Sequence, residues 1–148
     1  MIRSVFAAVV VAALSASTAV AESSSKALAI PASDSNIKWG NCPPFLPAGC
    51  ALGVLNGDPK KPNADVFFKL PAGAVLPHHY HTSAERMVLV SGELNITYDG
   101  QDPVTLKPGM YAYGPPNLGH KGQCAAGKDA CILFIAFEGP VDAIPTNK

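Results

Sequence analysis

Short apolar runs alternate with turn-forming residues along most of the chain. No stretch of about a dozen residues carries a helical apolar period that is free of glycine and proline, whereas β-prone runs recur at short intervals. The predicted strands are residues 50–55, 65–70, 75–81, 85–90, 93–98, 104–106, 110–114 and 131–137. Short strands at this spacing, separated by strong turn signals, predict an all-β sandwich or barrel.

Two of these segments show what the strands bury. Residues 93–98 alternate polar and apolar side chains, which is typical of a half-buried antiparallel strand. Residues 132–137 are almost continuously apolar, which favours a strand covered on both faces. Because no segment repeats at the scale of a domain, we expect a single barrel.

The first 21 residues have the features of a cleavable export signal. Arg3 provides the positive start, residues 5–14 form an unbroken apolar run, and Ala19-Val20-Ala21 is a small-x-small cleavage site. A membrane anchor is the alternative, but the run is well short of the ~20 apolar residues that span a bilayer. We therefore expect a periplasmic or secreted protein.

The remaining chain divides into a short lead-in and one domain. Residues 22–36 are mostly small or polar and have no sustained period, so we expect a flexible lead-in, with the domain over residues 37–148. The chain has 11 basic and 11 acidic residues, and loss of Arg3 leaves 10 basic residues. Without a basic excess, nucleic acid is not an expected partner, and we expect no membrane attachment after signal cleavage.

Four cysteines in an exported chain favour disulfide bonds. Three connectivities are available in principle, and sequence alone does not choose among them. The close spacing favours Cys42 with Cys50 and Cys124 with Cys131. Zinc binding is the alternative, but neither pair has the gap of two to four residues that is typical of structural zinc ligands.

The histidines gather in two places. On an extended strand His79 and His81 project from the same face, while His78 and Tyr80 point the other way. Glu85 follows after a gap that permits a tight turn, which would return its carboxylate to that face. His120 lies after a proline-rich turn and could complete the set from a neighbouring strand.

Three imidazoles and one carboxylate form a donor set for one divalent transition metal ion. Manganese, iron, nickel, copper, cobalt and zinc suit these donors, and calcium does not, because it prefers oxygen ligands. One or two coordination positions would stay open, as in a catalytic site. Each residue by itself is a weak signal, since a lone histidine is more often a packing or surface residue than a ligand.

The spacing around these residues resembles the two sequence motifs of the cupin superfamily. Residues 73–92 match G-x5-H-x-H-x3-E-x6-G at every gap, and residues 109–120 match G-x5-P-x-G-x2-H, with Asn117 in place of the glycine. Asparagine also tolerates positive φ, so this departure is mild. The second motif ends in an asparagine, where this chain has Cys124.

The resemblance implies a single antiparallel jelly-roll β-barrel, often dimeric, so a homodimer is a candidate assembly. It also implies one bound metal ion, with iron, manganese and zinc as the first candidates, held by His79, His81, Glu85 and His120. A narrower resemblance covers Trp39-Gly40 and Gly57-Asp58-Pro59, which look like small bacterial cupins of the ChrR type and of an aromatic-ketone dioxygenase.

Cupins include dioxygenases, decarboxylases, isomerases, lyases and binding proteins, so the family resemblance leaves the reaction open. The first hypothesis is a metal-dependent dioxygenase, an oxidoreductase acting on a small-molecule substrate. The alternatives are a metal or small-molecule binding or sensing module without turnover, and a metal-dependent lyase or isomerase.

Few side chains are candidates for a second catalytic group. Tyr111 and Tyr113 share one face of their strand, for which core packing is the favoured interpretation, and Tyr80 and Tyr98 are the other phenols. Strand parity points Arg86 and His78 away from the metal and places Met87 and Leu89 in the interior. The predicted cavity is therefore apolar, which favours a small and largely uncharged ligand.

Overall fold

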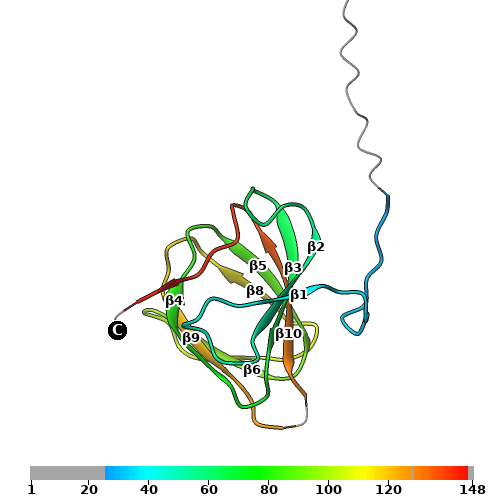
Figure 1. Cartoon of the computed structure of the whole chain (residues 1–148). Helices are drawn as coiled ribbons and strands as arrows, with labels where there is room; N and C mark the ends of the chain where they lie inside the picture. Colours follow the sequence, from blue (N-terminus) through cyan, green and yellow to red (C-terminus); the bar gives the residue numbers. More distant parts are fainter. Residues whose placement is uncertain (1–25, 128, 147–148) are drawn as a thin grey trace, which may run out of the picture.

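The computed structural model describes residues 26–127 and 129–146, which fold into two facing antiparallel sheets (Figure 1). In these ranges the chain is all-β, with eleven strands and no helix that could cross a membrane. The expected export signal, residues 1–21, lies outside the described residues. Residues 26–36 contain turns and no strand, and the domain boundary at residue 37 stays a prediction.

Within the described ranges one sheet has six strands and the other has five. The six-stranded sheet has the order β1 (Trp39–Asn41), β2 (Ala51–Asn56), β3 (Ala64–Leu70), β10 (Cys131–Phe137), β5 (Glu85–Ser91) and β8 (Tyr111–Gly114). The five-stranded sheet has the order β11 (Ile144–Pro145), β4 (Val75–Tyr80), β9 (His120–Cys124), β6 (Leu94–Tyr98) and β7 (Val104–Leu106). This is the predicted jelly-roll barrel.

The core lies between the two sheets because one face of each strand is apolar. Along β10 the residues Cys131, Leu133, Ile135 and Phe137 are buried and alternate with partly exposed ones. Residues of β5, β6 and β9 complete this core from both sheets, among them Met87, Leu89, Leu94, Ile96 and Cys124. Burial of these side chains is the main favourable contribution to the stability of the barrel.

All eight predicted strands are confirmed, each with bounds within one residue of the prediction. Three further strands, β1, β9 and β11, were not predicted. The prediction that Tyr111 and Tyr113 pack in the core is wrong. Their side chains are 60% and 48% exposed on the outer face of β8. Their exposure shows that the described chain does not cover this face of β8, which is the last strand of its sheet.

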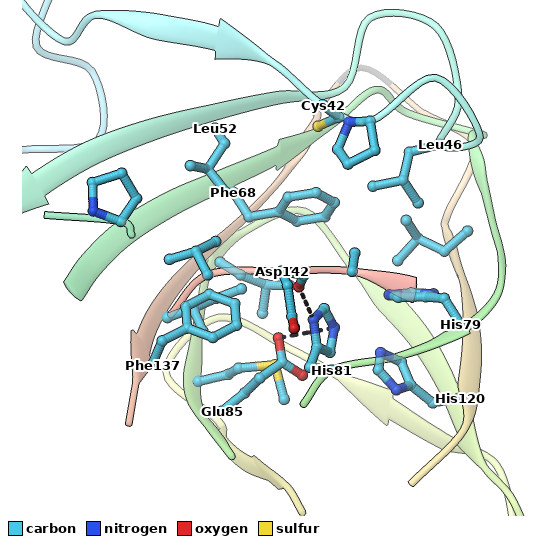
Figure 2. Close-up of a pocket in the computed structure, with 18 of the residues that line it drawn as sticks. Cys42, Leu46, Leu52, Phe68, His79, His81, Glu85, His120, Phe137 and Asp142 are labelled. Atoms are coloured by element: carbon cyan, nitrogen blue, oxygen red, sulfur yellow. Dashed lines mark hydrogen bonds and ion pairs between the residues drawn. The ribbon is translucent and has the colours of Figure 1, made fainter. Parts of the chain in front are cut away.

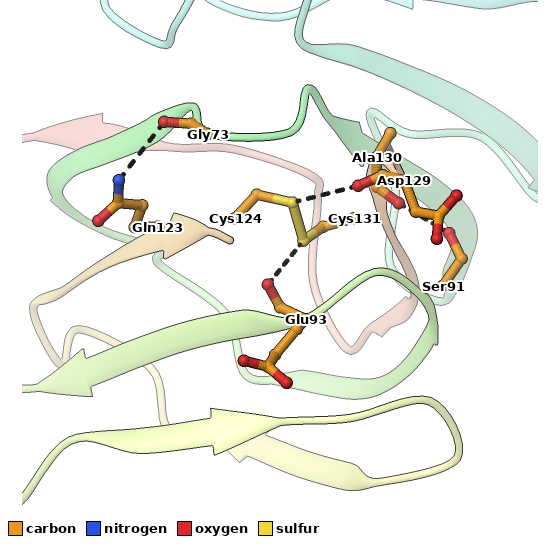
Figure 3. The surroundings of a disulfide bond; sticks show 8 residues. All are labelled: Gly73, Ser91, Glu93, Gln123, Cys124, Asp129, Ala130 and Cys131. Carbon is orange, nitrogen blue, oxygen red and sulfur yellow. Dashed lines mark hydrogen bonds between the residues drawn. A yellow bond between two sulfur atoms is a disulfide. The ribbon is translucent and has the colours of Figure 1, made fainter. Parts of the chain in front are cut away.

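Both predicted disulfides are present. Cys42–Cys50 closes the connection between β1 and β2, with a Cα–Cα distance of 5.7 Å. Cys124–Cys131 joins the end of β9 to the start of β10 and so links the two sheets (Figure 3). Gly92 packs against this bridge: its φ is +77°, and a Cβ there would lie 2.9 Å from both the Cα and the sulfur of Cys131. Only glycine fits this close approach.

Candidate metal centre

A cavity of about 260 Å³ lies between the two sheets (Figure 2). This volume exceeds that of known apolar cavities of about 150 Å³ that bind benzene. Most of its wall is apolar, with contributions from Leu46, Leu52, Phe68, Met87, Leu133 and Phe137. The polar side chains in the wall include those of His79, His81, Glu85, His120 and Asp142. Polar side chains therefore form a small part of the wall of a mostly apolar cavity.

Three histidines meet in this polar part of the wall. His79 lies on β4 directly opposite His120 on β9, and His81 follows the last residue of β4. One ring nitrogen from each histidine lies within 4.8 Å of the other two. All three side chains are buried, with relative exposures of 4–8%. The three imidazoles lie together as the sequence predicts, and their role as metal ligands stays a prediction.

Each of the three rings has its Nδ1 atom turned to a backbone carbonyl. His79 Nδ1 is 2.8 Å from the oxygen of Pro77, His120 Nδ1 is 3.4 Å from that of Leu118, and His81 Nδ1 contacts that of Asp142. A carbonyl only accepts hydrogen bonds, so Nδ1 carries the proton and Nε2 keeps its lone pair. Each ring therefore keeps its Nε2 lone pair for a cation, and a backbone carbonyl on the other nitrogen is typical of histidines that bind metals.

Burial keeps the rings neutral. It lowers the pKa of His79, lowers that of His81 to about 4 and lowers that of His120 to about 3. Repulsion from the neighbouring rings of the cluster lowers the pKa values of His81 and His120 further. Neutral imidazole is the form that binds metals, so the cluster is compatible with a divalent transition metal ion at neutral pH.

Glu85 lies beside the cluster. Its Oε1 is 3.3 Å from His81 Nε2, and the side chain is almost completely buried. The carboxylate is not part of the set of atoms within 4.8 Å of one another, so only the histidines form the compact group. Burial raises the pKa of Glu85 to about 8. The donors present, three nitrogens and one adjacent acidic oxygen, fit a borderline divalent ion.

Side chains predicted to point away from the site do so. His78 lies on the other face of β4, where its Nε2 is 2.8 Å from Asp99 Oδ1 and its Nδ1 contacts the hydroxyl of Thr146. Arg86 forms an ion pair with Glu138 outside the cavity. Met87 lines the cavity and Leu89 is fully buried in the core.

The second motif places a turn against the site. Asn117 has a φ of +61°, so it takes the conformation expected of the glycine it replaces. Its backbone N–H donates a hydrogen bond to the carbonyl of His81 at 2.8 Å. The turn before His120 is thus anchored to the segment that carries His81.

Tyr98 lies beside the cluster, with its ring centroid 4.9 Å from that of His120. A Cβ built on Gly114 would lie 2.9 Å from Tyr98 Oη and 3.0 Å from Glu85 Oε2, so both oxygens flank the same point. Among the described side chains, Tyr98 Oη is the buried polar atom without a hydrogen-bond partner. Burial and the nearby Glu85 raise the pKa of this phenol.

Asp142 was missed by sequence reasoning. It follows the last predicted strand, and its carboxylate accepts hydrogen bonds from the backbone N–H and the hydroxyl of Thr82. Its carbonyl orients His81 and its side chain is part of the cavity wall. No local signal identifies it, because each of these contacts spans about 60 residues of sequence.

Known proteins share this fold. Residues 66–136 match the family model described as a cupin domain. An uncharacterized protein of Methanocaldococcus jannaschii is 35% identical over 49 residues, which are 33% of this chain and 42% of that protein. This chain therefore spans less than half of that relative.

Solved structures agree in fold at low sequence identity. The crystal structure of the DMSP lyase DddQ from Ruegeria pomeroyi has a TM-score of 0.64 and 20% identity, covering 74% of this chain and 61% of that one. An RmlC-like cupin from Shewanella frigidimarina has a TM-score of 0.58 and 21% identity, covering 72% of this chain and 86% of that one. At these identities the likeness concerns the fold alone.

Proposed function

Because the chain belongs to the cupin superfamily, we propose that it is an exported metal-dependent oxidoreductase of the dioxygenase type. The proposed ligands of the ion are His79, His81, Glu85 and His120. The proposed substrate is a small, largely uncharged organic molecule that occupies the cavity beside them.

One observation carries this proposal: a ring nitrogen from each of three histidines lies within 4.8 Å of the other two, in the wall of an otherwise apolar cavity. Among the described residues, no lysine or arginine lines that cavity. A sugar phosphate or a dicarboxylate would therefore find no positive side chain in the wall, and any of its charge that does not reach the ion would lose its hydration at a cost of several kcal/mol. An apolar molecule with one or two oxygen atoms would leave no charge unpaired.

In the proposed reaction, different residues of the chain have different roles. A redox-active divalent ion, when bound, would supply the centre at which dioxygen and substrate react. The backbone carbonyls of Pro77, Leu118 and Asp142 hold the three imidazoles in place. The apolar wall excludes water, and the buried carboxylate of Glu85, one of the proposed ligands, would add a negative charge beside the ion.

The test is oxygen consumption by iron-loaded protein with a panel of small aromatic ketones. We expect uptake above that of a Glu85→Ala variant, and a His78→Ala variant serves as the matched control because His78 faces away from the cavity. Metal analysis of protein purified without supplementation accompanies this assay. Uptake no higher than that of Glu85→Ala across the panel would reject the dioxygenase proposal.

A lyase or isomerase is the second candidate, and the position of Tyr98 favours it. A buried phenol without a partner, next to a buried carboxyl group, is a proton donor or acceptor beside the cluster. Such chemistry needs a Lewis acid and no redox change, so zinc in the purified protein would support it, whereas iron or manganese would support the oxygenase. Bound metal without turnover of any kind would support the binding or sensing module.

Export is part of the proposal. The two disulfides are consistent with an oxidising compartment. We propose that residues 1–21 are removed and that the mature chain begins at Glu22, ahead of a lead-in to residue 36 and the domain over 37–148. Mass spectrometry of the protein from the periplasm or the medium should give this terminus, and a mature protein that keeps Met1 would contradict it.

A further inference from the structure

The connection between β1 and β2 forms one side of the cavity. We call residues 42–50 the 42–50 loop. Cys42, Pro43 and Leu46 from this loop line the cavity, and the ring of Phe45 lies 6.0 Å from that of His79. In Figure 2, Cys42 and Leu46 lie on the upper side of the cavity, across from His81 and Glu85.

The 42–50 loop is held in one shape. Asn41 pairs with Ala51 at its base, and the Cys42–Cys50 disulfide closes it at the next position. Within the loop, the N–H of Leu46 donates to the carbonyl of Pro43 at 3.0 Å, and that of Cys50 donates to Pro47 at 3.1 Å. Its prolines further restrict the backbone. A loop constrained in this way forms a wall of fixed position.

The rest of the wall comes mostly from the barrel. Leu52, Phe68, Met87 and Leu133 project from β2, β3, β5 and β10, whose backbones are held by hydrogen bonds to neighbouring strands. Leu46 is the apolar side chain that the 42–50 loop places against this core. The space available to a ligand therefore depends on how far Leu46 reaches into the cavity.

We propose that the 42–50 loop determines the ligand specificity of the cavity, with Leu46 limiting the length of the apolar ligand and the Cys42–Cys50 disulfide fixing the loop at that depth. The inference rests on the proposed function in taking the cavity as the ligand site. It does not depend on turnover or on the identity of the metal, because it concerns the apolar end of the ligand.

The test is the binding of n-alkylbenzenes of increasing chain length to the full chain as purified, measured by calorimetry. For the wild type, affinity should rise roughly fourfold with each added methylene. It should then fall sharply at a limiting length. Leu46→Ala should move that limit up by two to three carbons, and Leu46→Trp should move it down.

Leu106→Ala is the matched control. Leu106 is buried in the core to the same degree as Met87 and Leu133 of the cavity wall but does not line the cavity. Its truncation should lower the thermal midpoint and leave the limiting length unchanged. The same limit in Leu46→Ala as in the wild type, or no binding of any alkylbenzene to the wild type, would overturn the proposal.

The two disulfides provide a second comparison, because they span similar loops, with sequence separations of 8 and 7. A Cys42→Ala/Cys50→Ala variant should lose the sharp limit and bind longer alkylbenzenes. A Cys124→Ala/Cys131→Ala variant should be less stable but keep the limit. Should a double variant not fold, partial reduction of the wild type by a dithiol, with the reduced pair identified by mass spectrometry, gives the same comparison.

These outcomes are separate from the test of the proposed function. A shift of the limiting chain length without oxygen uptake would support the role of the 42–50 loop in specificity and reject the dioxygenase proposal. Oxygen uptake with an unchanged limiting chain length would support the dioxygenase proposal and reject the role of the loop.

Discussion

His81 donates a hydrogen bond from Nδ1 to the backbone carbonyl of Asp142, which lies 61 residues further along the chain. The carboxylate of Asp142 accepts a second hydrogen bond from the backbone N–H of Thr82 at 3.0 Å and a third from the Thr82 hydroxyl. The segment after β10 thus holds both the imidazole and the residue that follows it. The direction in which His81 Nε2 points depends on this contact.

Asp142→Ala should therefore weaken both the fold and the metal site. The variant leaves the Thr82 N–H and hydroxyl without their acceptor, so the free energy of unfolding should fall by about 1–3 kcal/mol. Loss of the anchor should reduce metal affinity about 10- to 100-fold. Urea denaturation and competition with a chelator measure the two effects.

Glu138→Ala is the control, because Glu138 belongs to the same segment and forms an exposed ion pair with Arg86. Its loss should change stability by no more than about 1 kcal/mol and should leave metal affinity unchanged. Wild-type metal affinity in Asp142→Ala would show that His81 is oriented by other contacts.

The metal-free protein should be most stable near neutral pH. Burial lowers the pKa of His81 and His120 to about 4 and about 3, from 6.5, so the unfolded chain binds more protons below pH 6.5. Stability is therefore lost as the pH falls from 6.5 toward 4. Glu85 acts in the opposite direction: burial raises its pKa from 4.5 to about 8, so the folded state binds the extra proton between these values.

Below pH 6.5 the effect of the two histidines on stability is larger than the opposite effect of Glu85. Between pH 6.5 and pH 8 only Glu85 changes the stability. In that upper range stability should decline by at most about 1.4 kcal/mol per pH unit. Urea denaturation with a chelator present, from pH 5 to 9, measures this profile. Glu85→Gln should abolish the decline above pH 6.5 and keep the acid decline, and an unchanged alkaline decline in that variant would contradict the assignment.

Tyr98→Phe should cost no stability. The hydroxyl is buried without a partner, so its removal should leave the free energy of unfolding unchanged or raise it by up to about 1 kcal/mol. Thermal and urea denaturation give the value. A loss of more than about 1 kcal/mol would mean that the hydroxyl is hydrogen-bonded in solution, and loss of turnover at unchanged stability would favour the lyase or isomerase over the oxygenase.

Gly114→Ala should disturb the site directly. The new methyl group would lie 2.9 Å from Tyr98 Oη and 3.0 Å from Glu85 Oε2, so both side chains must move. We expect a loss of about 1–3 kcal/mol in stability, together with weaker metal binding. Gly127→Ala is the control, because its Cβ would meet nothing within 4 Å. Equal metal affinity in the two variants would contradict the close approach at Gly114.

Local sequence patterns predicted most of the fold, because strand alternation and turn residues are local signals. These patterns did not predict strands that form only because a neighbouring strand pairs with them. β9 reads His-Lys-Gly-Gln-Cys and β11 contains only Ile144 and Pro145, so neither has an apolar run. Both are strands because β4 lies beside them and supplies hydrogen bonds.

The candidate site was predictable to the same extent. Strand parity placed His79 and His81 together, and motif spacing brought in His120. The contacts that orient these rings come from backbone carbonyls, which carry no residue signature, and from Asp142, whose distance along the chain hides it. The position of Glu85 outside the compact group depends on side-chain rotation, which the sequence does not encode as a pattern.

The bond between Cys124 and Cys131 restricts how far the two sheets can separate. It fastens one sheet to the other at the end of β9 that is farther from His120. The spacing of the sheets is covalently fixed there, so we expect any motion that widens the barrel to be smallest at this bond and larger near the histidines. We therefore expect the proposed ligand to enter and leave at the end of the barrel that carries the histidines.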